Sequence, residues 1–268
     1  MLKQRIITAI ILLPIAVGLI LYAPLAWLAA ALLLVVALGA HEWAALAGYS
    51  GEAGRIAYVA ATLAWCGALY MLGRYADWLS VMWPTMIAAA IWWISILVWI
   101  AFRRRSVPRS IKAVCGWLTL VPALFAAVAI AAYRPALLLW LFAIIWAADI
   151  GAYFAGKAFG RHKLAPEVSP GKTWEGIAGG TLAMLIVALC GWWWLTSRTQ
   201  PVLIAICLLT GWLSVVGDLS ESLLKRQAGA KDSGTLFPGH GGVLDRVDSL
   251  TAAAPFFWIG LKLAGWLV

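Results

Sequence analysis

Charged residues are scarce in this chain of 268 residues, at 12% of the total, and only 11 of them are acidic. An average soluble domain carries roughly a quarter charged residues. The four cysteines form no CxxC pair and no metal-ligand spacing, which excludes a disulfide-stapled scaffold and a cysteine metal cluster. Because 64% of the residues are hydrophobic, a water-soluble globule and a disordered chain are excluded as well. The composition predicts an integral membrane protein.

Two familiar catalytic motifs are incomplete. His41 and Glu42 begin an HEWAA segment that lacks the second His of the zinc-protease motif HExxH, so a structural or interfacial role is favoured for this pair. The Gly-Lys-Thr sequence at 171–173 lacks the earlier Gly of a P-loop, because Pro166 stands at that position. A zinc-protease and an ATPase are therefore not supported, although Thr173 suits the cap of a helix.

The apolar residues that remain fall into long runs. A bilayer span needs about 20 mostly apolar residues, and polar interruptions divide the chain into nine candidate helices. They are placed at 8–22, 25–46, 56–73, 78–101, 114–133, 136–156, 176–196, 202–220 and 251–268. The expected fold is an all-α polytopic integral membrane protein with about nine transmembrane helices.

The net charge of +9 is unevenly placed. With a cytoplasmic N-terminus, 16 of the 20 Lys and Arg residues lie on the inner side, as the positive-inside rule requires. The charge is therefore a topology signal, and we expect no nucleic-acid binding. The first apolar run continues too far for a cleaved signal peptide.

The polar material of the chain also gathers on the predicted inner side, in two expected cytoplasmic loops, 157–175 and 221–250. We divide the chain into N-terminal helices with a basic cytoplasmic loop (1–113) and a catalytic transmembrane region (114–268). The active site is expected to face the cytoplasm, and the short outer loops suggest a bacterial inner (plasma) membrane.

Besides Glu42, two acidic residues fall within or at the end of predicted spans. Asp149 lies in the sixth span and Asp218 ends the eighth. A carboxylate at membrane depth is costly unless it is paired or bound to a metal. A carboxylate that is merely hydrogen-bonded to neighbouring helices remains an alternative for each.

The segment 222–248, SLLKRQAGAKDSGTLFPGHGGVLDRVD, has the composition of a site for polyphosphate and a divalent metal. Carboxylates alternate with basic residues, and the turn before Val243 is rich in Gly, so its backbone N–H groups can approach an anion. Hard carboxylate oxygens suit Mg²⁺, which usually binds one or two carboxylates together with substrate phosphates.

That segment resembles the signature of the phosphatidate cytidylyltransferases, also called CDP-diglyceride synthases, and matches it at every specified position from Ser222 to Asp248. The resemblance extends to Asp149, Gly151, Tyr153 and the stretch from Ser169 to Glu175. It implies transfer of a cytidylyl group from CTP to phosphatidic acid in the membrane, with Mg²⁺ and a monovalent cation such as K⁺. A homodimer is also implied by this resemblance.

The resemblance places the metals on Asp218 and Asp245, and we expect Asp149 and Asp248 to be supporting ligands or acceptors. The residues expected to act in catalysis are Asp218, Asp245, Asp248, Lys225 and Arg246. Those expected to bind the substrates are Lys172, Ser169, Thr173, Arg226, Lys231, His240, Gly241 and Gly242.

Some alternatives stay open at this stage. His240 either contacts phosphate or organises the Gly turn, and Arg246 either binds phosphate or pairs with Asp248. A CTP-using lipid kinase and a related enzyme for another lipid headgroup are the nearest rival functions, and a transporter is a rival from another class. A CDP-alcohol phosphotransferase is excluded because the chain has no Asp-Gly dipeptide.

Overall fold

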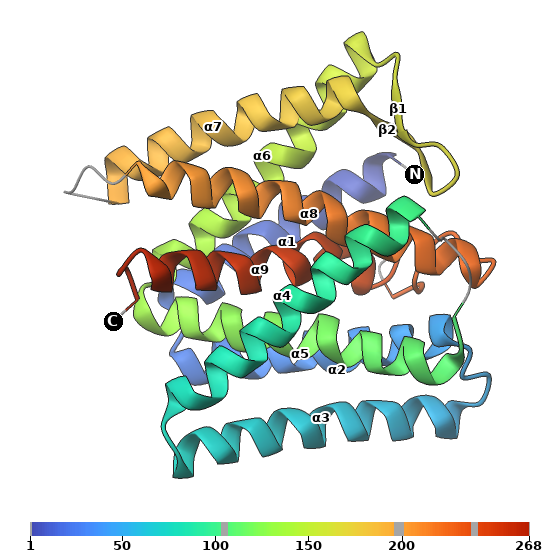
Figure 1. The fold of residues 1–268 in the computed structure, drawn as a ribbon, viewed down its shortest axis with the longest axis vertical. Coiled ribbons are helices and arrows are strands. Elements are labelled where there is room, and N and C mark those ends of the chain that lie inside the picture. The colour runs from blue at the N-terminus through green and yellow to red at the C-terminus, as the bar shows by residue number, and fades with distance from the viewer. Residues whose placement is uncertain (1, 103–106, 196–200, 237–240, 268) are drawn as a thin grey trace.

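The computed structural model describes residues 2–102, 107–195, 201–236 and 241–267, and within these ranges the chain forms nine α-helices and one two-stranded sheet (Figure 1). The elements in chain order are α1 (Leu2–Tyr22), α2 (Leu25–Ala47), α3 (Glu52–Tyr75), α4 (Trp78–Phe102), α5 (Arg109–Tyr133), α6 (Pro135–Phe159), β1 (Lys163–Ala165), β2 (Ser169–Thr173), α7 (Trp174–Leu195), α8 (Val202–Gln227) and α9 (Leu244–Leu263). The N-terminus, the sheet, the end of α8 and the start of α9 lie toward one end of the molecule, and the C-terminus lies at the other (Figure 1).

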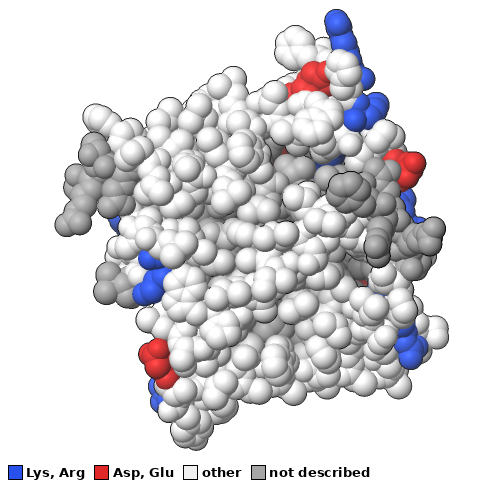
Figure 2. Space-filling view, viewed as in Figure 1, with Lys and Arg blue, Asp and Glu red and all other residues white. Residues whose placement is uncertain are grey.

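Seven of these helices, α2 to α8, are long and apolar enough to cross a membrane. The described apolar part of α1 is shorter, at Leu13–Tyr22, and α9 carries Asp245, Arg246, Asp248 and Lys262. Charged side chains lie mainly at the two ends of the helices, and the face between them is almost uncharged (Figure 2). The predicted multi-span helical protein is thereby confirmed in its coarse form.

Two local predictions need correction. Segment 157–175 is not wholly irregular, because β1 and β2 pair antiparallel, with Lys163 opposite Thr173. Segment 221–250 is not one loop, because α8 continues to Gln227 and α9 already begins at Leu244. The chain is otherwise helical, as expected, with this one short hairpin, and two helices are longer at the inner end than apolar runs alone indicate.

Helix α5 lies at the centre of the bundle and contacts α2, α4, α6 and α9. Its buried face is built from small and medium apolar residues, among them Leu120, Ala126 and Ile130. Opposite them, Phe257 and Leu261 of α9 are fully buried. This core holds the inner end of α9, which carries three charged residues, in a fixed position.

Helices α6 and α7 pack with their backbones in close contact. A Cβ atom on Gly151 would collide with the carbonyl oxygen of Gly179, so only glycine fits there. Small residues are the usual means by which membrane helices approach so closely, since van der Waals packing then replaces the hydrophobic effect. The pair forms a rigid support for the hairpin that joins the two helices.

The four cysteines are all free: Cys66 and Cys207 are buried, Cys115 is half-buried and Cys190 is exposed. The spacing of the cysteines in the sequence likewise gave no indication of a disulfide.

Candidate active site

The inner half of α8 presents a row of polar side chains. Asp218, Glu221 and Lys225 follow one another at intervals of three and four residues, which places them on the same face of a helix. Ser222 donates a hydrogen bond to Asp218 Oδ1 at 3.2 Å. Glu221 was not singled out from the sequence, although its spacing from Asp218 and Lys225 would have revealed it. Its side chain is only 4% exposed and lies 3.2 Å from Lys225 Nζ.

Asp245, in the first turn of α9, is the most heavily contacted carboxylate of the site. One oxygen is ion-paired with Lys225. The other accepts hydrogen bonds from Ser233 N at 2.9 Å, Ser233 Oγ at 3.0 Å and Gly242 N at 2.8 Å. Asp245 precedes the predicted span 251–268. Burial alone would favour its protonated form, but Lys225 and the two amides hold the pKa of Asp245 below its usual range. The group is therefore a fixed anion.

Lys172 joins the hairpin to α8. Its Nζ lies 2.8 Å from Asp218 Oδ2, and the two side chains are 22% and 32% exposed. The hairpin is held in place because Ala165 and Val168 pack with Val216, Leu219 and other apolar residues of α4 and α8. The sequence predicted both residues for the site, and the structure brings them together.

Asp248 lies one turn beyond Asp245 on α9. Its Oδ1 accepts a hydrogen bond from Ser249 N at 2.7 Å. The backbone of Asp248 lies very close to α8. A Cβ atom on Gly217 would collide with the carbonyl oxygen of Asp248. The charges of Asp218 and Lys172 act on Asp248, and they also act on Asp149, which is exposed on α6. The four predicted aspartates therefore share one region.

Glu42 of α2 completes the site from a distant part of the chain. Its carboxylate accepts hydrogen bonds from Val243 N at 2.8 Å, Leu244 N at 2.9 Å and Ser233 Oγ at 2.7 Å. It thus caps the start of α9, where orphan backbone N–H groups and the helix dipole favour an anion. Ser233 is hydrogen-bonded to both Glu42 and Asp245, so the cap that Glu42 provides also fixes the position of Asp245.

His41, beside Glu42, has a different position. Its Nε2 lies 2.9 Å from Glu52 Oε1, in an exposed pair that joins α2 to the start of α3. The sequence favoured a structural role for His41 and Glu42 together. The contacts of Glu42 agree with that interpretation and give it a position beside the acidic cluster.

The remaining predicted residues are less closely gathered. Thr173 Oγ accepts a hydrogen bond from Gly176 N at 3.1 Å, which confirms its prediction as the cap of α7. Ser169 is half-buried in the hairpin. Gly241 and Gly242 form the turn before α9, where Gly241 has a φ of 82° that favours glycine. The basic residues Arg226, Lys231 and Arg246 are exposed. His240 lies outside the described residues.

The site carries an excess of negative charge. Five carboxylates gather there, at Asp149, Asp218, Glu221, Asp245 and Asp248, and Lys172 and Lys225 are ion-paired with three of them. An anionic substrate is repelled by such a cluster unless further cations accompany it. Among the described residues, no three His, Cys, Asp or Glu side chains form a metal cage by themselves. Mg²⁺ fits the paired acids nonetheless, because it commonly takes its other ligands from water and substrate phosphates.

The same chain resembles known proteins along its whole length. A model of the cytidylyltransferase family matches residues 3–264. Phosphatidate cytidylyltransferase of Pseudomonas aeruginosa is 45% identical over 274 residues, which cover 99% of each chain. The enzyme of that name from Haemophilus influenzae is 38% identical over 290 residues, covering 96% of this chain and 97% of the relative. The one from Bacillus subtilis is 47% identical over 123 residues, which cover 45% of each chain.

Proposed function

This chain belongs to the cytidylyltransferase family, and from that premise we infer that it is a phosphatidate cytidylyltransferase of phospholipid biosynthesis. It converts CTP and phosphatidic acid to CDP-diacylglycerol and pyrophosphate. The likeness to enzymes of that name over 96–99% of the chain carries this assignment. The geometry that supports it is the cluster of Asp218, Asp245 and Asp248 with Lys172 and Lys225.

In the reaction, a phosphate oxygen of phosphatidic acid attacks the α-phosphorus of CTP. The bond from that phosphorus to the oxygen bridging to the β-phosphorus breaks, and pyrophosphate leaves with the electron pair. The attacking phosphate is already anionic at neutral pH, so no residue has to remove a proton. The difficulty is to bring two anions together, and catalysis in such transfers comes mainly from positioning and charge neutralisation.

We propose that Asp218 and Asp245 hold Mg²⁺, with Asp149 and Asp248 as further ligands or acceptors. A divalent ion at this place supplies charge neutralisation for the triphosphate and its leaving group. Asp245 is suited to this task because its contacts with Ser233 and Gly242 fix its orientation. A monovalent cation such as K⁺ is proposed as a second ion for the remaining negative charge.

The basic residues are proposed to bind the phosphates. Lys172 and Lys225 lie among the carboxylates. Lys172, in the more exposed pair, can exchange Asp218 for a substrate oxygen, whereas Lys225 stays paired and contributes its charge beside the phosphates. Arg226, Lys231 and Arg246 are exposed to the water from which CTP arrives. Ser169, His240 and the amides of Gly241 and Gly242 remain proposed substrate contacts.

The proposed topology has nine spans with a cytoplasmic N-terminus in the bacterial inner membrane. The active site then faces the cytoplasm, at the end of the bundle that holds the hairpin, the last turns of α8 and the start of α9. Phosphatidic acid reaches that level with its headgroup while its acyl chains stay in lipid. A homodimer is proposed as the functional assembly.

The assignment is tested with purified protein in detergent and radiolabelled CTP. The parent is expected to form CDP-diacylglycerol with phosphatidic acid and Mg²⁺, and to lose this activity on chelation. Asp218→Asn and Asp245→Asn should abolish it. Asp77→Asn is the matched control, because Asp77 is exposed in the loop between α3 and α4 and its carboxylate accepts a hydrogen bond from Ser80 N at 3.0 Å. A folded parent that forms no lipid product from CTP contradicts the assignment.

A further inference from the structure

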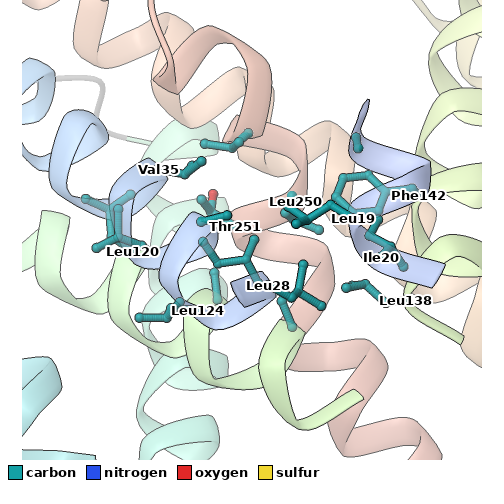
Figure 3. A pocket seen from close by; sticks show the side chains of 17 residues that line it. Leu19, Ile20, Leu28, Val35, Leu120, Leu124, Leu138, Phe142, Leu250 and Thr251 are labelled. Atoms are coloured by element: carbon teal, nitrogen blue, oxygen red, sulfur yellow. The ribbon is translucent and has the colours of Figure 1, made fainter. Parts of the chain in front are cut away.

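An apolar cavity of about 200 Å³ lies between α1, α2, α5, α6 and α9 (Figure 3). Leu28 of α2, Leu120 and Leu124 of α5 and Leu138 of α6 contribute to its walls (Figure 3). Thr251 is the sole polar side chain among the residues lining it. Its hydroxyl already donates a hydrogen bond to the carbonyl oxygen of Asp248 at 2.6 Å. A water molecule needs two to four polar partners to occupy a cavity, so this cavity is built for an apolar occupant.

Two helices lead from this cavity to the acidic cluster. On α9, Val247, Leu250 and Thr251 line it and lie within one turn of Asp248. On α6, Phe142 lines it, and Asp149 stands seven residues further along the same face. Two helical turns rise by about 10 Å. The cavity therefore begins directly below the carboxylates, on the side away from the proposed cytoplasmic end.

The walls of the cavity are not closed on every side. Leu28, Leu120 and Leu138 are buried, whereas Leu19, Leu32 and Phe142 are only half-buried and Ala16 is exposed. In a bilayer the neighbouring medium at such an opening is hydrocarbon. A lipid can thus place a chain in the cavity without passing through water.

From this continuity we propose that the cavity binds one acyl chain of the phosphatidic acid whose phosphate reacts at the acidic cluster. The proposal rests on the function assigned above and adds to it the place of the lipid tail. A chain held between α1, α2 and α9 fixes the distance of the phosphate from Asp218 and Asp245. It also makes the enzyme sensitive to acyl-chain length.

The first test fills the cavity with Ala31→Phe. Ala31 lines the cavity and is half-buried. The KM for dipalmitoyl phosphatidic acid is expected to rise about tenfold, the loss that follows when about two methylene groups leave an apolar site. The KM for dihexanoyl phosphatidic acid should stay within about twofold, because its shorter chains bury fewer methylene groups in the protein and depend less on the cavity.

The matched control is Ala143→Phe. Ala143 is also half-buried and lines a different apolar cavity, next to Trp140 and Gly191. This variant should handle the two lipids as the parent does. Equal changes for long-chain and short-chain lipid in Ala31→Phe, or the same selectivity in Ala143→Phe, overturn the proposal. A parent that makes no lipid product from either substrate refutes the assigned reaction instead.

A second measurement uses the unaltered protein, so that it does not depend on the folding of a variant. Phosphatidic acid with a diazirine at the middle of one acyl chain is photolysed with the enzyme in vesicles. Label is expected on peptides containing 28–36 and 247–251, and unlabelled phosphatidic acid should compete for it more strongly than phosphatidylcholine. Label spread evenly over the lipid-facing helices, or equal competition by both lipids, overturns the proposal.

Discussion

The two lysine–carboxylate pairs of the site are built differently. Lys225 and Asp245 join α8 to α9 with side chains 12% and 7% exposed. Lys172 and Asp218 join the hairpin to α8 with side chains 22% and 32% exposed. Asp245 has further donors in Ser233 and Gly242, whereas Asp218 has Ser222. One pair is fixed within the protein framework, and the other is open to exchange with a substrate.

The same two residue types, Lys and Asp, therefore serve two purposes within one site. Breaking a buried ion pair is costly because it leaves a charge without a partner in a medium of low dielectric. An exposed pair contributes little because water and salt screen it. Loss of activity alone does not distinguish the two pairs, whereas the change in the free energy of unfolding does.

The largest expected effect comes from the two aspartates. Asp218→Ala and Asp245→Ala should each lower the rate of CDP-diacylglycerol formation by at least about 100-fold, as expected for metal ligands. Asp245→Ala should also destabilise the fold by about 3 kcal/mol or more, whereas Asp218→Ala should cost about 1 kcal/mol or less. Thermal unfolding followed by tryptophan fluorescence in detergent measures the contrast. Equal stability losses would show that the two pairs do not differ.

Substitution of the two lysines tests the same difference between the pairs, and its effects on stability and activity should be smaller. Lys225→Met leaves Glu221 and Asp245 together without a cation and should lower stability by about 2–3 kcal/mol. Lys172→Met should leave stability within about 1 kcal/mol. It should reduce kcat/KM for CTP by about 10–100-fold, the value of one charge-assisted hydrogen bond. Partial rescue by Lys172→Arg would support a charge contact, and an unchanged kcat/KM in Lys172→Met would contradict it.

The smallest expected effect concerns the support of the fixed pair. Glu42→Gln weakens an acceptor at the start of α9 and should lower stability by about 1–2 kcal/mol. The kcat should fall by up to about tenfold with little change in the KM for CTP, because Glu42 acts through Ser233 and the helix start. Glu52→Gln is the control, since Glu52 is 65% exposed in its pair with His41 and should change stability by less than about 0.5 kcal/mol. A Glu42→Gln protein as stable and active as the parent would exclude the positioning role.

Local sequence pattern was sufficient for much of this arrangement. Apolar runs of span length predicted the helices, and Thr173 was correctly placed at the start of α7, because a cap depends on residues only three positions apart. The acidic and basic residues of the signature from Ser222 to Asp248 pointed to the site. The pairing of Lys172 with Asp218 was not predictable from spacing, since the two belong to elements that meet only in the fold.

The errors share one physical cause. The hairpin of β1 and β2 depends on packing against α4 and α8, and the early start of α9 depends on hydrogen bonds to Glu42, 201 and 202 residues away. The charged residues of segment 221–250 were assigned to a loop because a lipid-facing helix rarely carries them. Here Glu221 and Asp245 pair with Lys225 inside the bundle, so the helices continue.

The cap that Glu42 provides has a consequence for how the protein is made. Chains emerge from the ribosome with the N-terminal part first, so α2 enters the membrane long before α9 is synthesised. The carboxylate of Glu42 therefore lacks its backbone N–H donors until about 200 further residues have been synthesised. Once Val243 and Leu244 have been synthesised, their N–H groups bind Glu42 and fix the position of Asp245. The site is therefore complete only after α9 has been synthesised and has docked on α2.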